Sequence, residues 1–395
     1  MRTALLLLLP ITCSATGLQR FELGPQAFRI AEAYSDARGF GFEPGSTGFF
    51  SVRASEGNYR VRVGFAATEV QRRAALWAEQ RRLMAEPLLQ SGAPTEVSFI
   101  VNLRRPELPS LPANATGGTR VALKPREFGS RTWDDRLTLR LGNLPAIPSW
   151  VSVEPVTVPT LYLAGDSTVT DQPEAPSGSW GQFIPRYFGN GIAVANHAES
   201  GESLKSFVTE LRLDKLLSNL RTGDWVMIQF GHNDQKSQWP QTYADAATTY
   251  RDWLRVYIAE IRRRGATPLL VTSPERRNFD ARGRIVATLA DYPAAMRAVA
   301  AEQNVALLDL NPLSVKFYEA LGPELSPRAF ADEGRDKTHH NEYGARQLAR
   351  AVIEALRVAD PALTAGLEKH IAADAAHFDP SHPDLPRSDL PNETQ

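Results

Sequence analysis

Residues 160–168, TLYLAGDST, begin the pattern that decides the fold of the second half of the chain. An apolar run of strand length ends at a glycine, and polar residues follow at once. Continuous runs of similar length recur at 192–195, 225–230, 268–272 and 306–310. Such runs are typical of strands buried on both faces, as in a parallel sheet. The sequence therefore predicts five parallel strands.

Segments with a helical period separate these predicted strands. Before Gly265 and after Asn341, apolar residues recur at intervals of three and four, as on one face of a helix. Helices between parallel strands cover both faces of the sheet. We therefore expect an α/β, flavodoxin-like, three-layer domain with a five-stranded parallel sheet over residues 159–371. The two clearest stripes consist of Tyr243, Ala247, Tyr250, Leu254, Tyr257 and Ile261, and of Ala345, Leu348, Val352 and Leu356.

The first part of the chain has a different pattern. Apolar and polar residues alternate around residues 59–65, 97–101 and 137–141, which is typical of half-buried strands. The sequence predicts an all-β sandwich over residues 18–145, with one helix near residues 70–84. Prolines at 145, 148, 155 and 159 predict a linker over residues 146–158.

The two ends of the chain carry their own signals. Arg2, an apolar run over residues 4–11 and small residues after it have the layout of a secretory signal peptide, which we expect over residues 1–17. The only cysteine, Cys13, would be removed with it, leaving no disulfide or thiol ligand. We expect a secreted or periplasmic protein without membrane insertion of the mature chain. Residues 372–395 are rich in Pro and Asp and predict a disordered tail or a surface strap.

The balance of charge argues against two classes of partner. Lys plus Arg number 44 and Asp plus Glu number 45, so the formal net charge is −1 at pH 7. A chain with so little net charge has no overall field that attracts nucleic acid or an anionic membrane. We expect no nucleic-acid partner and favour a neutral, small or polymeric ligand.

Candidate functional residues follow three of the predicted strands. Ser167 follows the first, Gly201 lies after the second and Asn233 follows the third. The carboxyl ends of parallel strands meet at one edge, where ligands bind. If Ser167 attacks a carbonyl group there, the N–H groups of Ser167 and Gly201 and the side-chain amide of Asn233 can form an oxyanion hole. Taken singly, these residues equally fit a helix cap, a tight turn and an Asx turn.

The serine needs a base, for which Asp336 and His339 are the candidates. They lie three residues apart, just before the last predicted helix, so one turn can aim the imidazole at the serine while the carboxylate holds it. The adjacent His340 is the alternative base. A metal site of Asp336, His339 and His340 with His232 or His197 is a further alternative, but the spacing is unlike that of metalloproteases. We expect no metal and no cofactor.

Four short blocks, GDS at 165–167, SGES at 200–203, GHND at 231–234 and DKTH at 336–339, occur in this order. Together they resemble the SGNH (GDSL) hydrolases, which share a Ser, a Gly, an Asn and a His. The stretches LAGDSTVTDQ, SWGQFIPRYF, NHAESGESLKSF, IQFGHNDQK and DKTHHNEYGA are similar to the rhamnogalacturonan acetylesterases, over residues 160–357. The resemblance implies a triad of Ser167, His339 and Asp336, because the spacing from Asp336 matches His339. His340 stands where we associate an aromatic residue with this family.

The resemblance also implies a function and a domain arrangement. The function is that of a serine esterase removing acetyl groups from a plant cell-wall polysaccharide, rhamnogalacturonan or pectin, through an acyl-enzyme. The predicted sandwich would be a jelly-roll, galactose-binding-like domain. The alternatives are a lipase or thioesterase, a deacetylase of another glycan, and a carbohydrate-binding protein with an inactive hydrolase domain. A lipase needs an extended apolar groove for the acyl chain, and no sequence pattern indicates one. All proposed catalytic residues are present, which argues against an inactive hydrolase domain.

Overall fold

The parallel sheet of the second half contains the five predicted strands. They are β12 (Thr160–Gly165), β14 (Ala193–Asn196), β15 (Trp225–Gln229), β16 (Thr267–Val271) and β17 (Ala306–Leu308). Their order in the sheet is β14-β12-β15-β16-β17, and each pairs in parallel with its neighbour. The computed structural model describes residues 17–23, 33–46, 48–112, 114, 117–289, 291–369, 375 and 378–385. Except for Gly17, the predicted signal peptide, residues 1–17, lies outside the described residues.

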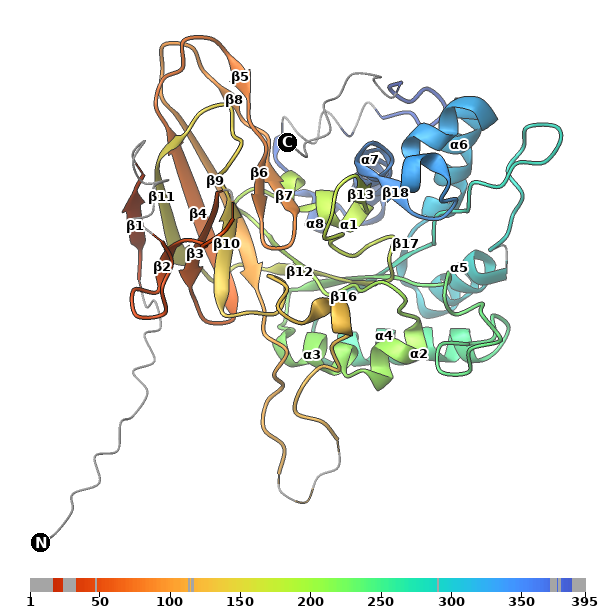
Figure 1. Cartoon of the computed structure of the whole chain (residues 1–395). Helices are drawn as coiled ribbons and strands as arrows, with labels where there is room; N and C mark the ends of the chain where they lie inside the picture. The colour runs from red at the N-terminus through yellow and green to blue at the C-terminus, as the bar shows by residue number, and fades with distance from the viewer. Residues whose placement is uncertain are drawn as a thin grey trace, which may run out of the picture.

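Helices cover both faces of this sheet, because alternate strand residues point in opposite directions. Leu161 and Leu163 pack into one buried cluster, and Tyr162 and Ala164 pack into another. Figure 1 shows α1, α6 and α7 on one side of the sheet and α2, α3 and α4 on the other. The helices of the first face are α1 (Trp180–Phe183), α6 (Leu310–Leu325), α7 (Glu342–Ala359) and α8 (Pro361–Thr364); those of the second are α2 (Leu204–Thr209), α3 (Arg212–Asn219), α4 (Thr249–Arg263) and α5 (Asp291–Gln303).

The sheet is larger than the five strands predicted, because four strands from the first part of the chain continue it. Strand β9 (Thr95–Leu103) pairs in parallel with β14, joining Val101 to Val194. Strands β4 (Gly57–Phe65), β11 (Pro148–Pro155) and β1 (Gln19–Glu22) follow in antiparallel pairing. The predicted linker at 146–158 therefore contains a strand. Prolines flank β11, whereas Val151 and Val153 between them alternate into the core.

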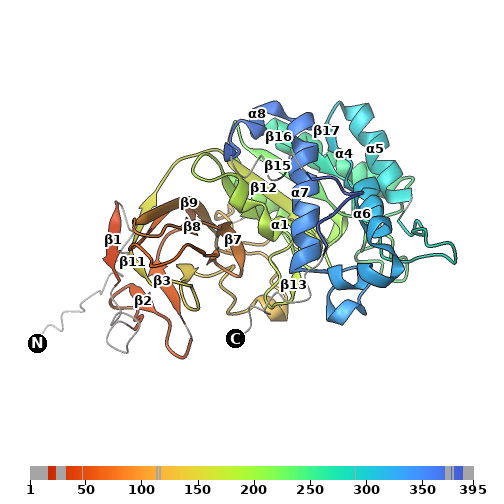
Figure 2. The same cartoon turned by 90° about the horizontal axis from the view of Figure 1, so that it is seen from above.

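A second sheet packs against these N-terminal strands. It contains β2 (Phe40–Phe42), β3 (Phe49–Arg53), β10 (Arg136–Arg140), β6 (Leu76–Ala78) and β7 (Arg82–Ala85) in that order, and the two sheets share one apolar core. A short pair, β5 (Arg72–Arg73) and β8 (Leu88–Leu89), lies at their margin. The helix predicted near residues 70–84 is wrong, because Glu79 and Arg81 have φ of 54° and 109°, which turns β6 into β7 and excludes a helix. Figure 2 shows this β-rich part beside the α/β part.

The described residues of the predicted tail pack on the α/β part. Ala375 and Phe378 are buried in the cluster formed with α7. Asp384 accepts a hydrogen bond from Arg350 at 2.7 Å, and its carbonyl oxygen accepts one from the Tyr343 hydroxyl. The described residues of this segment therefore pack against α7. Within the described ranges, no helix combines the length and the apolar character needed to cross a membrane.

Candidate active site

The predicted site residues meet at the carboxyl edge of the parallel sheet. Ser167 follows β12, Gly201 follows β14 and Asn233 follows β15. His339 comes from the far end of the chain, where β18 (His340–Asn341) pairs with β13 (Ser177–Gly178) close after the serine turn. The structure therefore brings together segments about 170 residues apart, as the distance of 2.9 Å between Ser167 Oγ and His339 Nε2 shows.

The turn that presents Ser167 is held by the carboxylate before it. Asp166 is fully buried and accepts hydrogen bonds from the backbone N–H and the hydroxyl of Thr168, at 2.9 and 2.8 Å. His232 lies 3.3 Å from the same carboxylate. Burial alone would raise the pKa of Asp166, but His232 and the Thr168 bonds outweigh it and lower the pKa. Asp166 thus stays ionised and fixes the turn.

Ser167, His339 and Asp336 form a chain of two hydrogen bonds. His339 Nδ1 lies 2.7 Å from Asp336 Oδ2, and His339 Nε2 lies 2.9 Å from Ser167 Oγ. The other Asp336 oxygen accepts the backbone N–H groups of Thr338 and His339, at 2.6 and 2.8 Å. Partial burial would raise the pKa of Asp336, but these hydrogen bonds outweigh it and hold the pKa well below its usual range. The carboxylate can therefore orient the imidazole and stabilise its protonated form.

His340 points away from this chain of hydrogen bonds. Its Nε2 lies 2.7 Å from the Tyr318 hydroxyl, and its ring packs on Phe330 with the centroids 4.5 Å apart. The side chain is 1% exposed, and burial lowers its pKa to about 3. His340 is therefore neutral at physiological pH and fills the aromatic packing position expected there.

This burial of His340 predicts a pH dependence of stability. In the unfolded chain the pKa returns to about 6.5, so the unfolded state binds a proton that the folded state excludes. Between pH 6.5 and 3 the free energy of unfolding should therefore fall as pH falls, by up to about 1.4 kcal/mol per pH unit from this group. His340→Gln should remove this share of the slope in urea unfolding at pH 7, 6 and 5. His382→Gln, at a side chain 82% exposed, is the control; an unchanged slope in His340→Gln would contradict the expectation.

Two backbone N–H groups at the site are free to receive an oxyanion. Within the described ranges, no acceptor is hydrogen-bonded to the N–H of Ser167 or of Gly201. Gly201 has φ of +85°, a conformation that other L-residues rarely adopt. The Asn233 amide nitrogen donates to the Glu202 carbonyl oxygen at 2.9 Å, so its second hydrogen is left for the site. Asn233 thus lies against the loop that carries Gly201.

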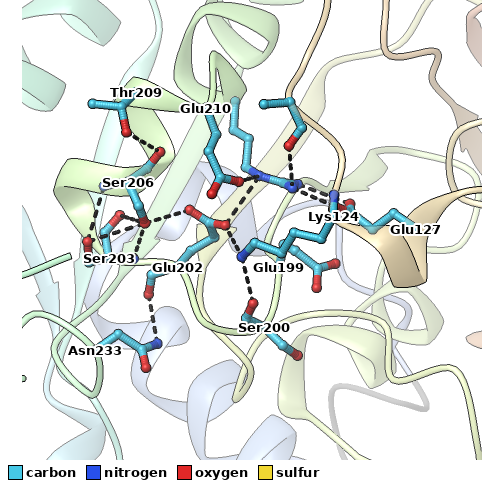
Figure 3. Close-up of polar contacts among 12 residues, drawn as sticks. Lys124, Glu127, Glu199, Ser200, Glu202, Ser203, Ser206, Thr209, Glu210 and Asn233 are labelled. Atoms are coloured by element: carbon cyan, nitrogen blue, oxygen red, sulfur yellow. Dashed lines mark hydrogen bonds and ion pairs between the residues drawn. The ribbon is translucent and has the colours of Figure 1, made fainter. Parts of the chain in front are cut away.

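A charged cluster beneath this loop joins it to the N-terminal part of the chain. Glu202 is fully buried, and Figure 3 shows Lys124 bonded both to its carboxylate and to the Ser200 carbonyl oxygen. Arg212 Nε lies 3.4 Å from Glu202 and 3.0 Å from Glu210. Its other nitrogens donate to Glu127 at 3.1 and 2.5 Å. Two cations, Lys124 and Arg212, therefore hold Glu202 in place next to Gly201.

A second buried pair supports the serine turn in the same way. Arg82 on β7 donates to Asp171 at 2.5 Å, and both side chains are nearly inaccessible. Asn196 donates to the other Asp171 oxygen at 2.8 Å and to the Val169 carbonyl oxygen at 2.7 Å. Sequence reasoning missed Arg82, Lys124 and Arg212. No local signal marks them, because each pairs with a residue distant in sequence.

The structure does not bring together the histidines of the alternative metal site. Within the described ranges, no three His, Cys, Asp or Glu side chains are placed to hold a metal ion. His232 contacts Asp166, and His340 contacts Tyr318. His197 is fully buried against Trp133 and Tyr162, and burial lowers its pKa well below 6.5.

Comparison with known proteins shows where this chain has relatives. Residues 163–347 match the model of the GDSL-like lipase/acylhydrolase family. The chain is 42% identical over 209 residues to rhamnogalacturonan acetylesterase RhgT of Bacillus subtilis, covering 50% of this chain and 88% of that protein. It is 38% identical over 212 residues to the probable rhamnogalacturonan acetylesterase YesY of the same organism, covering 53% and 97%.

Two solved structures are also similar. The crystal structure of protein YxiM of Bacillus subtilis covers 86% of this chain and 98% of its own, with 22% identity and a TM-score of 0.49. An acetylxylan esterase from Geobacillus stearothermophilus covers 50% of this chain and 94% of its own, with 19% identity and a TM-score of 0.37.

Proposed function

This chain belongs to the GDSL-like lipase/acylhydrolase family, and from that premise we propose that it is a serine esterase that removes acetyl groups from a plant cell-wall polysaccharide, most specifically rhamnogalacturonan. The observation that carries the proposal is the chain of hydrogen bonds from Ser167 through His339 to Asp336. The relatives named as rhamnogalacturonan acetylesterases support the substrate class. Export of the chain, predicted from residues 1–17, fits a substrate outside the cell.

The first half of the proposed reaction forms an acetyl-enzyme. Ser167 Oγ attacks the acetyl carbonyl carbon while His339 Nε2 takes the hydroxyl proton. Negative charge develops on the carbonyl oxygen, which the Ser167 and Gly201 N–H groups and the Asn233 amide stabilise; one such donor is typically worth roughly 10²–10³ in rate. The C–O bond to the sugar then breaks, and His339 returns the proton to the sugar oxygen.

The second half releases acetate. His339 takes a proton from a water molecule, whose oxygen attacks the acetyl carbon held on Ser167. The same three donors stabilise the second oxyanion. The bond to Ser167 Oγ breaks, His339 returns the proton to it, and acetate leaves. Asp336 remains ionised throughout and stabilises the imidazolium in both halves, as its lowered pKa requires.

The surroundings of Ser167 favour a sugar ester over a long acyl ester. The cleft next to the serine turn is lined by polar and charged side chains, among them Gln80, Arg126 and Gln172. Such side chains match sugar hydroxyls, whereas a long acyl chain needs apolar walls. A small acetyl group needs no extended groove, so binding energy comes from the sugar chain and orients the ester.

Acetate release tests the proposal. Purified protein should release acetate from acetylated rhamnogalacturonan and cleave 4-nitrophenyl acetate at least about tenfold faster than the octanoate, because none of the described residues that line the cleft has a large aliphatic or aromatic side chain to pack on an octanoyl chain. EDTA should leave both activities unchanged. Faster octanoate cleavage without acetate release from any acetylated glycan would replace the proposal by the lipase or thioesterase alternative, and binding of glycan without hydrolysis would indicate an inactive domain.

A further inference from the structure

The side-chain amide of Asn233 can serve an oxyanion only if its nitrogen faces the reacting carbonyl group. Asn233 is 5% exposed and lies in the loop that follows β15. The two ends of an amide have nearly the same size, so a half-turn about the last side-chain bond exchanges the donor for an acceptor. An oxygen at that position would repel the developing negative charge. The proposed reaction therefore depends on the groups that fix the direction of this amide.

Two hydrogen bonds fix the Asn233 amide in the structure. Its Nδ2 donates to the Glu202 carbonyl oxygen at 2.9 Å, as Figure 3 shows. Its Oδ1 accepts a hydrogen bond from Lys236 Nζ at 2.8 Å. An ammonium group has only donors, so it pairs with the amide oxygen and not with the nitrogen. A half-turn would set nitrogen against the ammonium and oxygen against the Glu202 carbonyl oxygen, and both bonds would be lost.

The Lys236 side chain is itself held in place by a neighbour in the same loop. Its ammonium lies over the Trp239 ring, 4.8 Å from the centroid, which is a cation–π contact. The backbone supports this arrangement, because the Lys236 N–H donates to the Asn233 carbonyl oxygen at 3.2 Å and the Trp239 N–H donates to the Lys236 carbonyl oxygen at 2.9 Å. The loop therefore places the ammonium between the indole ring and the amide.

The charge of Lys236 makes this contact stronger than a neutral hydrogen bond. Hydrogen bonds from a charged donor are roughly twice as strong as neutral ones. A cation at the amide oxygen also polarises the amide, so its N–H groups become better donors. Within the described ranges, no carboxylate forms an ion pair with Lys236. The charge therefore acts on the Asn233 amide and is not taken up by a paired acid.

We propose that Lys236 is a positioning residue of the oxyanion hole: its ammonium holds the Asn233 amide with one N–H group directed at the oxyanion, and Trp239 holds the lysine. The inference rests on the proposed function and deepens it, because it concerns the transition state formed at Ser167. Lys236 contacts Asn233 and acts through it. Its contribution therefore belongs to the rate of the chemical step rather than to the binding of the sugar.

Removal of the ammonium tests this proposal. Lys236→Met should lower kcat/KM for 4-nitrophenyl acetate about tenfold, a part of the roughly 10²–10³ that a whole donor contributes. This substrate carries no sugar, so a lost sugar contact cannot explain the loss. With acetylated rhamnogalacturonan, kcat should fall by a similar factor while KM changes less than about twofold. Lys236→Arg keeps a cationic donor and should recover most of the rate.

A matched lysine and a double-mutant cycle provide the controls. Lys205 on α2 donates to the Pro240 carbonyl oxygen of the same loop at 2.6 Å, and Lys205→Met should keep the wild-type rate. In an Asn233→Ala background, where the amide is absent, Lys236→Met should change kcat/KM by less than about twofold. If circular dichroism shows that Lys236→Met does not fold, Lys236→Gln takes its place in each measurement, with a loss of at least about threefold expected because the charge is absent.

Three results would overturn the inference and leave the esterase standing. They are an unchanged rate without the ammonium, a loss confined to KM, and an equally large loss in the Asn233→Ala background. The last of these would show that the lysine acts without the amide. Failure of the wild type to hydrolyse any acetyl ester would instead overturn the proposed function.

Discussion

Ser167→Ala should lower kcat/KM for 4-nitrophenyl acetate on the order of 10⁴-fold or more, while the protein stays folded. The change removes only the oxygen that lies 2.9 Å from His339 Nε2. His339→Ala should cost a similar factor, because nucleophile and base act as one unit. The double variant should therefore be hardly worse than either single one. Steady-state kinetics of the three variants, with circular dichroism as the check on folding, measure this.

A matched serine and a matched histidine serve as controls. Ser237→Ala, at an exposed residue of the loop after β15, should keep the wild-type rate. His340→Gln should lose far less activity than His339→Ala, because His340 bonds Tyr318 and not the serine. A Ser167→Ala protein that still turned over the ester near the wild-type rate would refute the proposed nucleophile. A larger loss at His340 than at His339 would reverse the assignment of the base.

The parts of the structure that follow from local pattern could be predicted from the sequence. The five parallel strands are confirmed, because each is a continuous apolar run whose neighbours have a helical period. The resemblance to the SGNH (GDSL) hydrolases is confirmed by the family match over residues 163–347. Ser167 follows a strand of the parallel sheet, whose carboxyl ends lie at one edge. Asp336 and His339 lie between α6 and α7 instead, and the pairing of β18 with β13 brings them to the serine. Their catalytic roles remain predictions.

The parts that depend on distant pairing could not be predicted. Nothing in residues 95–103 shows that this strand pairs with residue 194 as well as with β4. The same pairing extends the sheet beyond five strands. The prolines in residues 145–159 indicated a linker, although apolar and polar residues alternate within β11. Residues 70–84 contain apolar residues at spacings that fit either a helix or two short strands. The likeness of the N-terminal sheets to a galactose-binding domain stays a prediction.

These distant pairings imply that the N-terminal part is not a separable sugar-binding module. Three of its side chains reach the catalytic loops: Arg82 bonds Asp171 near the serine, and Lys124 and Glu127 bond the cluster beneath Gly201. Deleting residues 18–145 would also remove β9 from the edge of β14. Such a deletion should therefore impair hydrolysis of small esters as well as of polymer, and point variants give the sharper test.

Arg212→Met should be the most destabilising of these point variants. Arg212 is 1% exposed and has Glu127, Glu202 and Glu210 as ion partners. Breaking a buried ion pair by removing one partner typically costs about 3–5 kcal/mol, because the remaining charge stays buried and unpaired. We expect a loss of that size in the free energy of unfolding by urea. Because Glu202 lies next to Gly201, kcat of the folded fraction should also fall, by about tenfold or more.

Two further variants show whether the effect comes from the link between the two parts of the chain. Arg212 donates to Glu127 of the N-terminal part, so in a double-mutant cycle Glu127→Gln and Arg212→Met should be strongly non-additive in both stability and kcat. Arg255→Met on α4, which breaks exposed ion pairs with Asp252 of the same helix and with Glu302 of α5, should change neither quantity appreciably. If Arg212→Met changed stability and kcat as little as Arg255→Met, the buried ion pairs would contribute no more than exposed ones. The N-terminal part would then not be needed to hold the loop that carries Gly201. If the two parts of the chain unfold together, the wild type should show a single unfolding transition in urea. In Arg212→Met this transition should remain single and move as a whole to a lower urea concentration.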